Sequence, residues 1–179
     1  MKAVMLSVHP KWCGLIASGK KTIEVRKTKP RLETPFKCYI YCTKGETIYL
    51  PRDIFGNNAM NGKVIGEFVC DRIRVENEVA DQLVDVGIMC HSCLSSEELL
   101  RYADGKALYS WHISDLKIYD EPKALSDFYV YCERCDKRPI ACKFAYEESN
   151  ENGYYSECMC DFKRPIERPP QSWCYVEEV

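Results

Sequence analysis

The densest group of residues that could do chemistry is the run Gly19-Lys20-Lys21-Thr22-Ile23-Glu24-Val25-Arg26. Lys21 offers a mobile point charge that suits a phosphate or a polarised carbonyl. Glu24 can accept a hydrogen bond from a base edge, and Arg26 offers a planar donor fork on which a base can also stack. These residue types predict a site for an anion or a nucleobase. The alternative is an ordinary surface pair between Glu24 and Arg26, which would contribute almost nothing to stability.

The segment around this run is basic, although the chain as a whole is not. The formal net charge is -2. Residues 20–31 carry +5 and the remainder carries -7, because six basic side chains there are opposed only by Glu24. The basic residues are Lys20, Lys21, Arg26, Lys27, Lys29 and Arg31. Such a patch on an acidic body offers an anion a landing site, whereas a solvated charged strand and loop is the simpler interpretation.

Two elements position the run. A helix is expected to begin at Pro10, to carry Trp12, Leu15 and Ile16 at helical spacing, and to end at Gly19. Residues 22–27 alternate in the manner of a half-buried strand, with Thr22, Glu24 and Arg26 on one face. Lys21 precedes the strand, so strand periodicity does not fix its direction.

The rest of the chain reads mainly as strands. Strands are expected over residues 3–8, 36–42, 63–75, 107–119 and 172–179, a helix from Ser95 through Tyr102, and a loop over 44–62. Many strands and few helices predict an α+β, mainly-β fold, a small closed or nearly closed barrel with short flanking helices.

Several aromatic residues are candidates for a cleft beside the run. Trp12, Trp111 and Trp173 could stack on a base, as aromatic side chains do when proteins hold single-stranded RNA. Each of them is also an ordinary core residue by type. His112 should face away from Trp111 and Ile113, and a hydrogen-bonded structural histidine is the favoured interpretation.

A second pattern is Cys132-x2-Cys135-x6-Cys142-x15-Cys158-x-Cys160. Its spacing predicts a structural zinc held by Cys132, Cys135, Cys158 and Cys160, with Cys142 as the alternate ligand. The alternative is a set of free or core thiols. Four thiolates would leave no open coordination position, so the metal would not be catalytic. Residues 147–153 between them are expected to form a hairpin tip, and the separate pair Cys90 and Cys93 is interpreted as chance.

The chain shows no targeting or membrane signal. Its N-terminus is broken by Pro10 too early for a secretory signal, and no stretch approaches the ~18 apolar residues that a membrane span requires. We therefore expect a protein that stays in the reducing cytoplasm and has no membrane partner. There, the twelve cysteines are expected to be thiols or metal ligands.

The sequence resembles the ASCH superfamily, whose fold is a β-barrel similar to the PUA domain. Its signature G-x-K-x-x-E-x-R is matched in full from Gly19 to Arg26, between the first helix and the second strand. Ser7-Val8-His9-Pro10, residues 108–113 and residues 169–176 agree with it. The resemblance implies a barrel formed by residues 1–128 and 169–179, with a Cys-rich insert over 129–168 as in some prophage and bacterial members.

The resemblance also implies a function. Family members are implicated in RNA metabolism, so the chain is expected to bind RNA or a modified nucleoside, and no organic cofactor is expected. The expected ligand-binding residues are His9, Trp12, Lys21, Thr22, Glu24, Arg26, Trp111 and Trp173.

Two alternatives to simple binding follow from the same comparison and from the insert. One is an enzyme with Lys21 and Glu24 as catalytic residues, either a ribonuclease or an amidohydrolase on N4-acetylcytidine. The amidohydrolase branch reads G-x-K-T-x-T-x-R. Lys21 and Thr22 match that pattern, but Glu24 occupies its second threonine, and a carboxylate cannot simply replace a hydroxyl. The other alternative is an adaptor that docks a protein partner through the insert.

Overall fold

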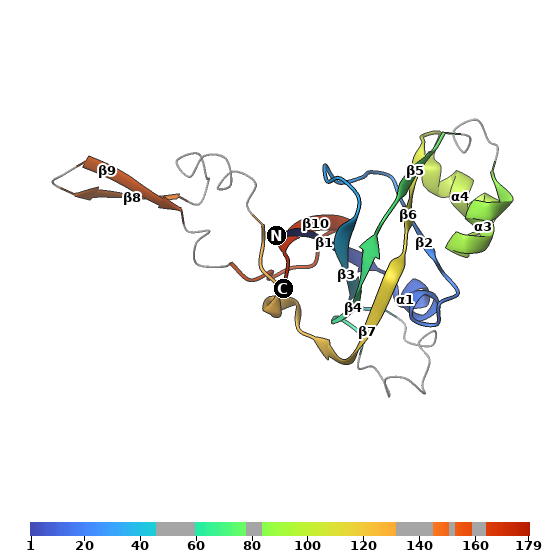
Figure 1. Ribbon diagram of the computed structural model, residues 1–179, viewed down its shortest axis with the longest axis horizontal. Helices are drawn as coiled ribbons and strands as arrows, with labels where there is room; N and C mark the ends of the chain where they lie inside the picture. Colours follow the sequence, from blue (N-terminus) through green and yellow to red (C-terminus); the bar gives the residue numbers. More distant parts are fainter. Residues whose placement is uncertain (46–59, 78–83, 132–144, 151–152, 159–163) are drawn as a thin grey trace.

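The structure is a computed structural model of the 179-residue chain. It describes residues 1–45, 60–77, 84–131 and 164–179, together with the backbone of 145–150 and 153–158. In these residues, eight strands form two sheets with three α-helices beside them, and two further strands form a separate pair (Figure 1). This arrangement confirms the expected mainly-β α+β class.

The first sheet has the strand order β10-β1-β3-β4-β7. Its strands are β1 (Lys2–Val8), β3 (Phe36–Cys42), β4 (Val64–Cys70), β7 (Ser114–Lys123) and β10 (Trp173–Glu177). β1 runs parallel to β3 and antiparallel to β10. Met5 on one face of β1 and Leu6 on the other belong to separate hydrophobic clusters, and both are fully buried. Burial on both faces explains why the strand is a continuous apolar run.

The second sheet has the order β2-β6-β5, formed by β2 (Ile23–Arg26), β5 (Ile73–Glu76) and β6 (Leu108–His112). The helices α3 (Val86–Ser92) and α4 (Ser96–Ala103) cover one side of it, as Figure 1 shows. Val25 of β2 packs there against Ile88 of α3 and Leu99 of α4. This contact anchors β2, which carries the predicted site.

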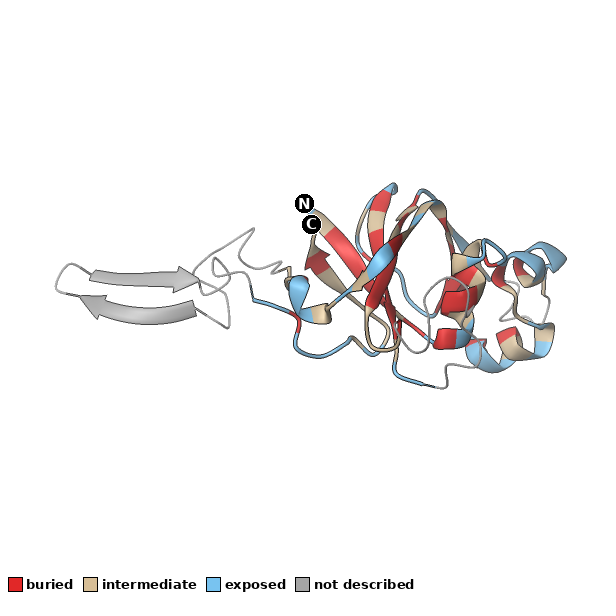
Figure 2. Ribbon diagram, turned by 90° about the horizontal axis from the view of Figure 1, so that it is seen from below, coloured by how far each residue is buried: buried red, intermediate tan, exposed pale blue. Residues whose placement is uncertain are grey.

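The two sheets share one core. Leu6 and Ile40 of the first sheet belong to the same buried cluster as Trp111 of the second, together with Ile16 of α1 (Pro10–Ala17). Trp111 is fully buried and meets the ring of Phe36 edge-on, with centroids 5.8 Å apart. In Figure 2 the buried residues run along the strands, and the outer faces of the helices are exposed.

The expected closed barrel is not found: among the described strands, no hydrogen-bonded pairing joins the two sheets into a ring. Two predicted strands are also divided. Residues 63–75 form β4 in the first sheet and β5 in the second. Residues 107–119 form β6 in the second sheet and the start of β7 in the first. The breaks fall at residues 71–72 and at Ile113, where the chain crosses from one sheet to the other. Neither break contains the Gly or Pro that would have marked it in the sequence.

The local signals for two helices are confirmed. Pro10 begins α1, and Gly19 follows it with a φ of +70°, a conformation that suits glycine. At α4, the Ser95 hydroxyl accepts from the Glu98 N–H and the Glu98 carboxylate accepts from the Ser95 N–H. The sequence missed α3, whose Asp85 side chain caps Gly87 N.

The ends of the predicted insert lie side by side. The Ile166 N–H donates to the Phe128 carbonyl at 2.8 Å, and both side chains are buried in the cluster that contains Met5. A short 3-10 turn (Leu125–Asp127) precedes them. Between them, β8 (Ala145–Asn150) pairs antiparallel with β9 (Gly153–Cys158). Most of the residues expected to form the hairpin tip, 147–153, therefore belong to the two strands.

Candidate functional site

A cavity of about 300 Å³ lies beside the signature run. His9 and Trp12 line it from the start of α1, and Lys21, Glu24 and Arg26 line it from β2 and the turn before it. The other lining residues are Ser7, Val8, Val25, Leu94 and Tyr102. The structure thus brings together five of the eight side chains that were expected to bind a ligand.

A buried ionic triad forms the floor of this cavity, and we use that name for Lys21, Glu24 and Arg26. Glu24 stands between the two cations, with Oε2 3.3 Å from Lys21 Nζ and Oε1 2.9 Å from Arg26 Nε. The three residues are 3%, 7% and 7% exposed. They are therefore not the exposed surface pair that the sequence left as an alternative.

The turn after α1 places Lys21 in the triad. The Leu15 carbonyl accepts from the N–H groups of both Lys20 and Lys21, which fixes the backbone as it leaves Gly19. Lys21 Nζ then donates to the carbonyls of Ile23 and Ser92, each at 2.8 Å. The ammonium group therefore donates two hydrogen bonds to backbone carbonyls and forms an ion pair with Glu24.

Arg26 connects β2 to the first sheet. Its guanidinium donates to the Ser7 carbonyl at 2.8 Å and to the Ser172 carbonyl at 3.2 Å. Ser7 is the last residue but one of β1, and Ser172 directly precedes β10. Arg26 therefore holds three segments together, and much of its donor fork is already used within the protein. With two cations and one carboxylate, the triad keeps a formal charge of +1.

Two aromatic side chains, Trp12 and Tyr102, line the cavity. Lys11 Nζ lies 4.3 Å and Lys21 Nζ 5.4 Å from the centroid of the Trp12 ring. Tyr102, from α4, is 37% exposed, and Lys27 Nζ lies 5.0 Å from its ring centroid. Partial burial raises the pKa of the Tyr102 phenol, so the ring stays neutral at physiological pH. The sequence placed Tyr102 on its helix but did not assign it to the site.

Three expected ligand-binding residues lie elsewhere. Thr22 precedes β2, so strand periodicity does not place it with Glu24, and its Oγ1 lies 3.1 Å from His91 Nδ1 in a different cavity. Trp111 is fully enclosed in the shared core. Trp173 Nε1 donates to Thr28 Oγ1 at 3.0 Å, and neither tryptophan is among the residues that line the cavity.

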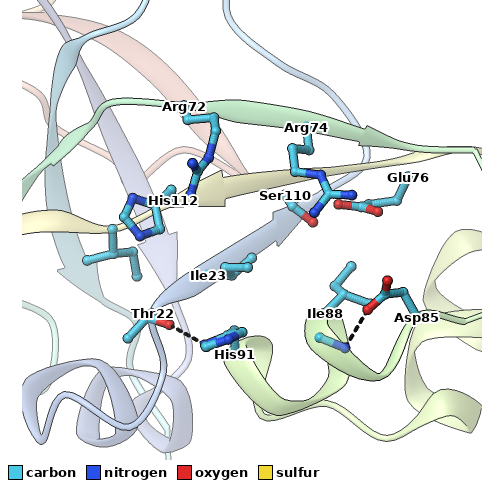
Figure 3. A pocket seen from close by; sticks show the side chains of 12 residues that line it. Thr22, Ile23, Arg72, Arg74, Glu76, Asp85, Ile88, His91, Ser110 and His112 are labelled. Carbon is cyan, nitrogen blue, oxygen red and sulfur yellow. Dashed lines mark hydrogen bonds between the residues drawn. The ribbon is translucent and has the colours of Figure 1, made fainter.

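The cavity that contains Thr22 has a volume of about 570 Å³ (Figure 3). It lies between β2, β5, β6 and α3. Nothing in the sequence pattern indicated it. Its lining includes His112, whose Nδ1 lies 2.7 Å from Asp71 Oδ1. This contact agrees with the expected structural, hydrogen-bonded histidine.

The predicted zinc ligands lie outside the described residues: Cys132, Cys135, Cys142 and Cys160 fall in segments without description, and only the backbone of Cys158 is described. In the described part of the chain, no group of three or more His, Cys, Asp or Glu side chains could hold a metal ion. The structural zinc therefore stays a prediction from the cysteine spacing.

The comparison with known proteins agrees with the signature run. The sequence profile of the ASCH domain matches residues 6–137, about three quarters of the chain. This chain belongs to the ASCH family. ASCH domains have a PUA-like fold and are generally proposed to be RNA-binding modules. No curated protein matches the chain in sequence.

Solved ASCH structures share the fold of this ASCH protein. The crystal structure of ASCH from Zymomonas mobilis superposes with a TM-score of 0.55 and 17% identity, over 98% of this chain and 88% of that one. A serine-to-alanine mutant of the Zymomonas mobilis protein superposes with a TM-score of 0.54 and 16% identity, over 98% of this chain and 89% of that one. At this identity the likeness concerns the fold alone.

Among the described helices of this ASCH domain, none has the length and apolar character that crossing a membrane requires.

Proposed function

We propose that this ASCH domain binds RNA and takes one base, plain or modified, into the cavity between Trp12 and Tyr102. The observation that supports the proposal is that a buried, net positive group and two aromatic side chains, Trp12 and Tyr102, line the same cavity. Aromatic faces stack on bases regardless of their identity, and each such contact contributes about 1–3 kcal/mol. A cavity of about 300 Å³ is of the size that a base requires.

The charges around the cavity suit a nucleic acid. The triad carries one net positive charge, and Lys11 and Lys27 hold their ammonium groups over the two aromatic rings. These lysines can meet the phosphates on either side of the bound base. Binding of this kind weakens as salt increases, because phosphate contacts release counterions from the strand.

The contacts of Lys21 favour binding over catalysis. A ribonuclease or an amidohydrolase that used Lys21 and Glu24 would need one of them to exchange a proton with the ligand. Lys21 Nζ already donates to two backbone carbonyls and pairs with Glu24, and both carboxylate oxygens of Glu24 face cations. The triad in this geometry is a fixed electrostatic floor. The adaptor alternative depends on the insert and remains a proposal from the sequence alone.

The test is a fluorescence titration of a short labelled single-stranded RNA at low salt. Tyr102→Leu keeps an apolar side chain but removes the stacking face, so we expect it to weaken binding about tenfold. Tyr109→Leu is the matched control, because Tyr109 is a partly buried tyrosine of β6 outside the cavity. Wild type that binds neither RNA nor free nucleosides, or equal effects of the two substitutions, would refute the proposal.

A further inference from the structure

The second cavity has the chemistry of an anion site. Arg72 and Arg74 line it from β5 and the residue before it, and the guanidinium of Arg72 points toward His112 in Figure 3. Neither guanidinium makes a hydrogen bond or an ion pair with any other described residue. Free arginines beside a histidine are typical of sites that bind phosphate.

A buried hydroxyl in the same wall is an independent observation. Ser110 of β6 is 3% exposed, lines the cavity, and its Oγ has no hydrogen-bond partner among the described residues. It pairs with Arg74 across the strands, so the two side chains belong to neighbouring positions of one sheet. A buried polar group without a partner is costly, and a bound ligand can supply the missing partner.

The second cavity also contains two carboxylates, and one of them, Glu76, follows Arg74 by two residues on β5. Glu76 makes no hydrogen bond or ion pair with a described residue, and Asp85 accepts a hydrogen bond from Gly87 N at the start of α3. Such a carboxylate can accept from an exocyclic amine of a base. The cavity therefore contains groups suited to a phosphate and groups suited to a hydrogen-bond donor, which together match a nucleotide.

The two cavities lie on either side of one turn. Lys21 and Thr22 are consecutive residues that line the first and the second cavity respectively. α3 connects them as well, because the Ser92 carbonyl accepts from Lys21 Nζ while the His91 ring contacts Thr22 Oγ1. An RNA strand that places one base in the first cavity can therefore continue past this turn toward the second cavity.

We propose that the second cavity is a neighbouring-nucleotide subsite, in which Arg72 and Arg74 bind a phosphate of the RNA strand whose base occupies the first cavity. The inference rests on the proposed RNA-binding function. It adds a second contact with the RNA strand, formed by residues outside the signature run. It predicts that a strand binds more tightly than the nucleoside that fills the first cavity alone.

The test compares a labelled six-nucleotide single-stranded RNA with a free nucleoside, using the full chain. The double variant Arg72→Gln/Arg74→Gln should weaken binding of the RNA about tenfold. It should also reduce the slope of log K against log salt by about 0.7 for each phosphate contact that is lost. Affinity for the nucleoside should stay unchanged. Arg101→Gln is the control, because Arg101 is an exposed arginine of α4 outside both cavities.

The outcomes separate the two proposals. If wild type binds the RNA and Tyr102→Leu weakens it, but the double variant behaves like Arg101→Gln, the subsite is wrong and the RNA-binding function stands. If the double variant weakens RNA and nucleoside equally, the subsite is also wrong. If wild type binds no RNA, both proposals fail. Thermal unfolding of each variant checks that the fold is retained.

Discussion

The carboxylate of Glu24 lies 2.9 Å from the guanidinium of Arg26, and both side chains are less than a tenth exposed. The same carboxylate faces Lys21 at 3.3 Å, so one anion compensates two buried cations. Buried charges are costly unless they are paired. The signature run therefore has a structural role in joining the two sheets as well as a proposed role at the ligand.

Glu24→Gln should destabilise the protein more than the loss of one surface contact would. The substitution keeps the shape of the side chain but leaves Lys21 and Arg26 buried without a counter-charge. We expect the free energy of unfolding to fall by about 3 kcal/mol. Urea unfolding followed by circular dichroism measures this loss.

Glu97→Gln is the matched control for that experiment. Glu97 contacts Arg101 at 2.8 Å, but its side chain and that of Arg101 are 83% and 73% exposed. Such a pair contributes about 0.5 kcal/mol or less. Equal losses for the two substitutions would contradict the structural role of the triad.

Short-range rules explain why the residues of the signature run that line the first cavity could be grouped from the sequence. Gly19 ends the helix with a positive φ, and the alternation of β2 places Glu24 and Arg26 on one face. These features need only the residues of the run itself. Tyr102 could not be assigned in this way, because it reaches the cavity through the packing of α4 against β2.

The sequence failed where the chain changes sheet. Residues 63–75 and 107–119 each read as one strand, but both cross between the sheets, and Asp71 and His112 meet near these crossings, 2.7 Å apart. Ile113 interrupts the second strand without any turn residue. Only the pairing with distant strands decides where such a break falls. The second cavity lies beside this crossing, so its residues could not be grouped from the sequence.

Buried thiols should make the protein less stable at alkaline pH. Burial raises the pKa of Cys70 from its ordinary value of 9.0 to about 12, while a backbone hydrogen bond to Arg72 opposes the shift. Burial also raises the pKa of Cys38. Between the ordinary and the raised values, the unfolded chain has lost the thiol proton and the folded chain retains it. The free energy of unfolding should therefore fall as pH increases through this range.

Cys70→Ala should make that pH dependence shallower. One thiol contributes at most about 1.4 kcal/mol per pH unit to the slope of the unfolding free energy. Urea titrations at several alkaline pH values measure the slope, and Cys90→Ser serves as the control because Cys90 is exposed. A slope that Cys70→Ala leaves unchanged would show that this thiol does not contribute.

The cysteine spacing predicts about one Zn²⁺ per chain, held by Cys132, Cys135, Cys158 and Cys160. The metal would replace the hydrophobic core that a small insert lacks, so binding and folding of the insert would be coupled. Cys132→Ser/Cys135→Ser should abolish the metal content measured by elemental analysis, whereas Cys90→Ser/Cys93→Ser should leave it unchanged. Metal loss in the second variant would instead assign the other C-x2-C pair to the site. A wild-type protein that neither contains zinc nor binds added Zn²⁺ would leave the thiols free, and the insert would then have to fold without a metal.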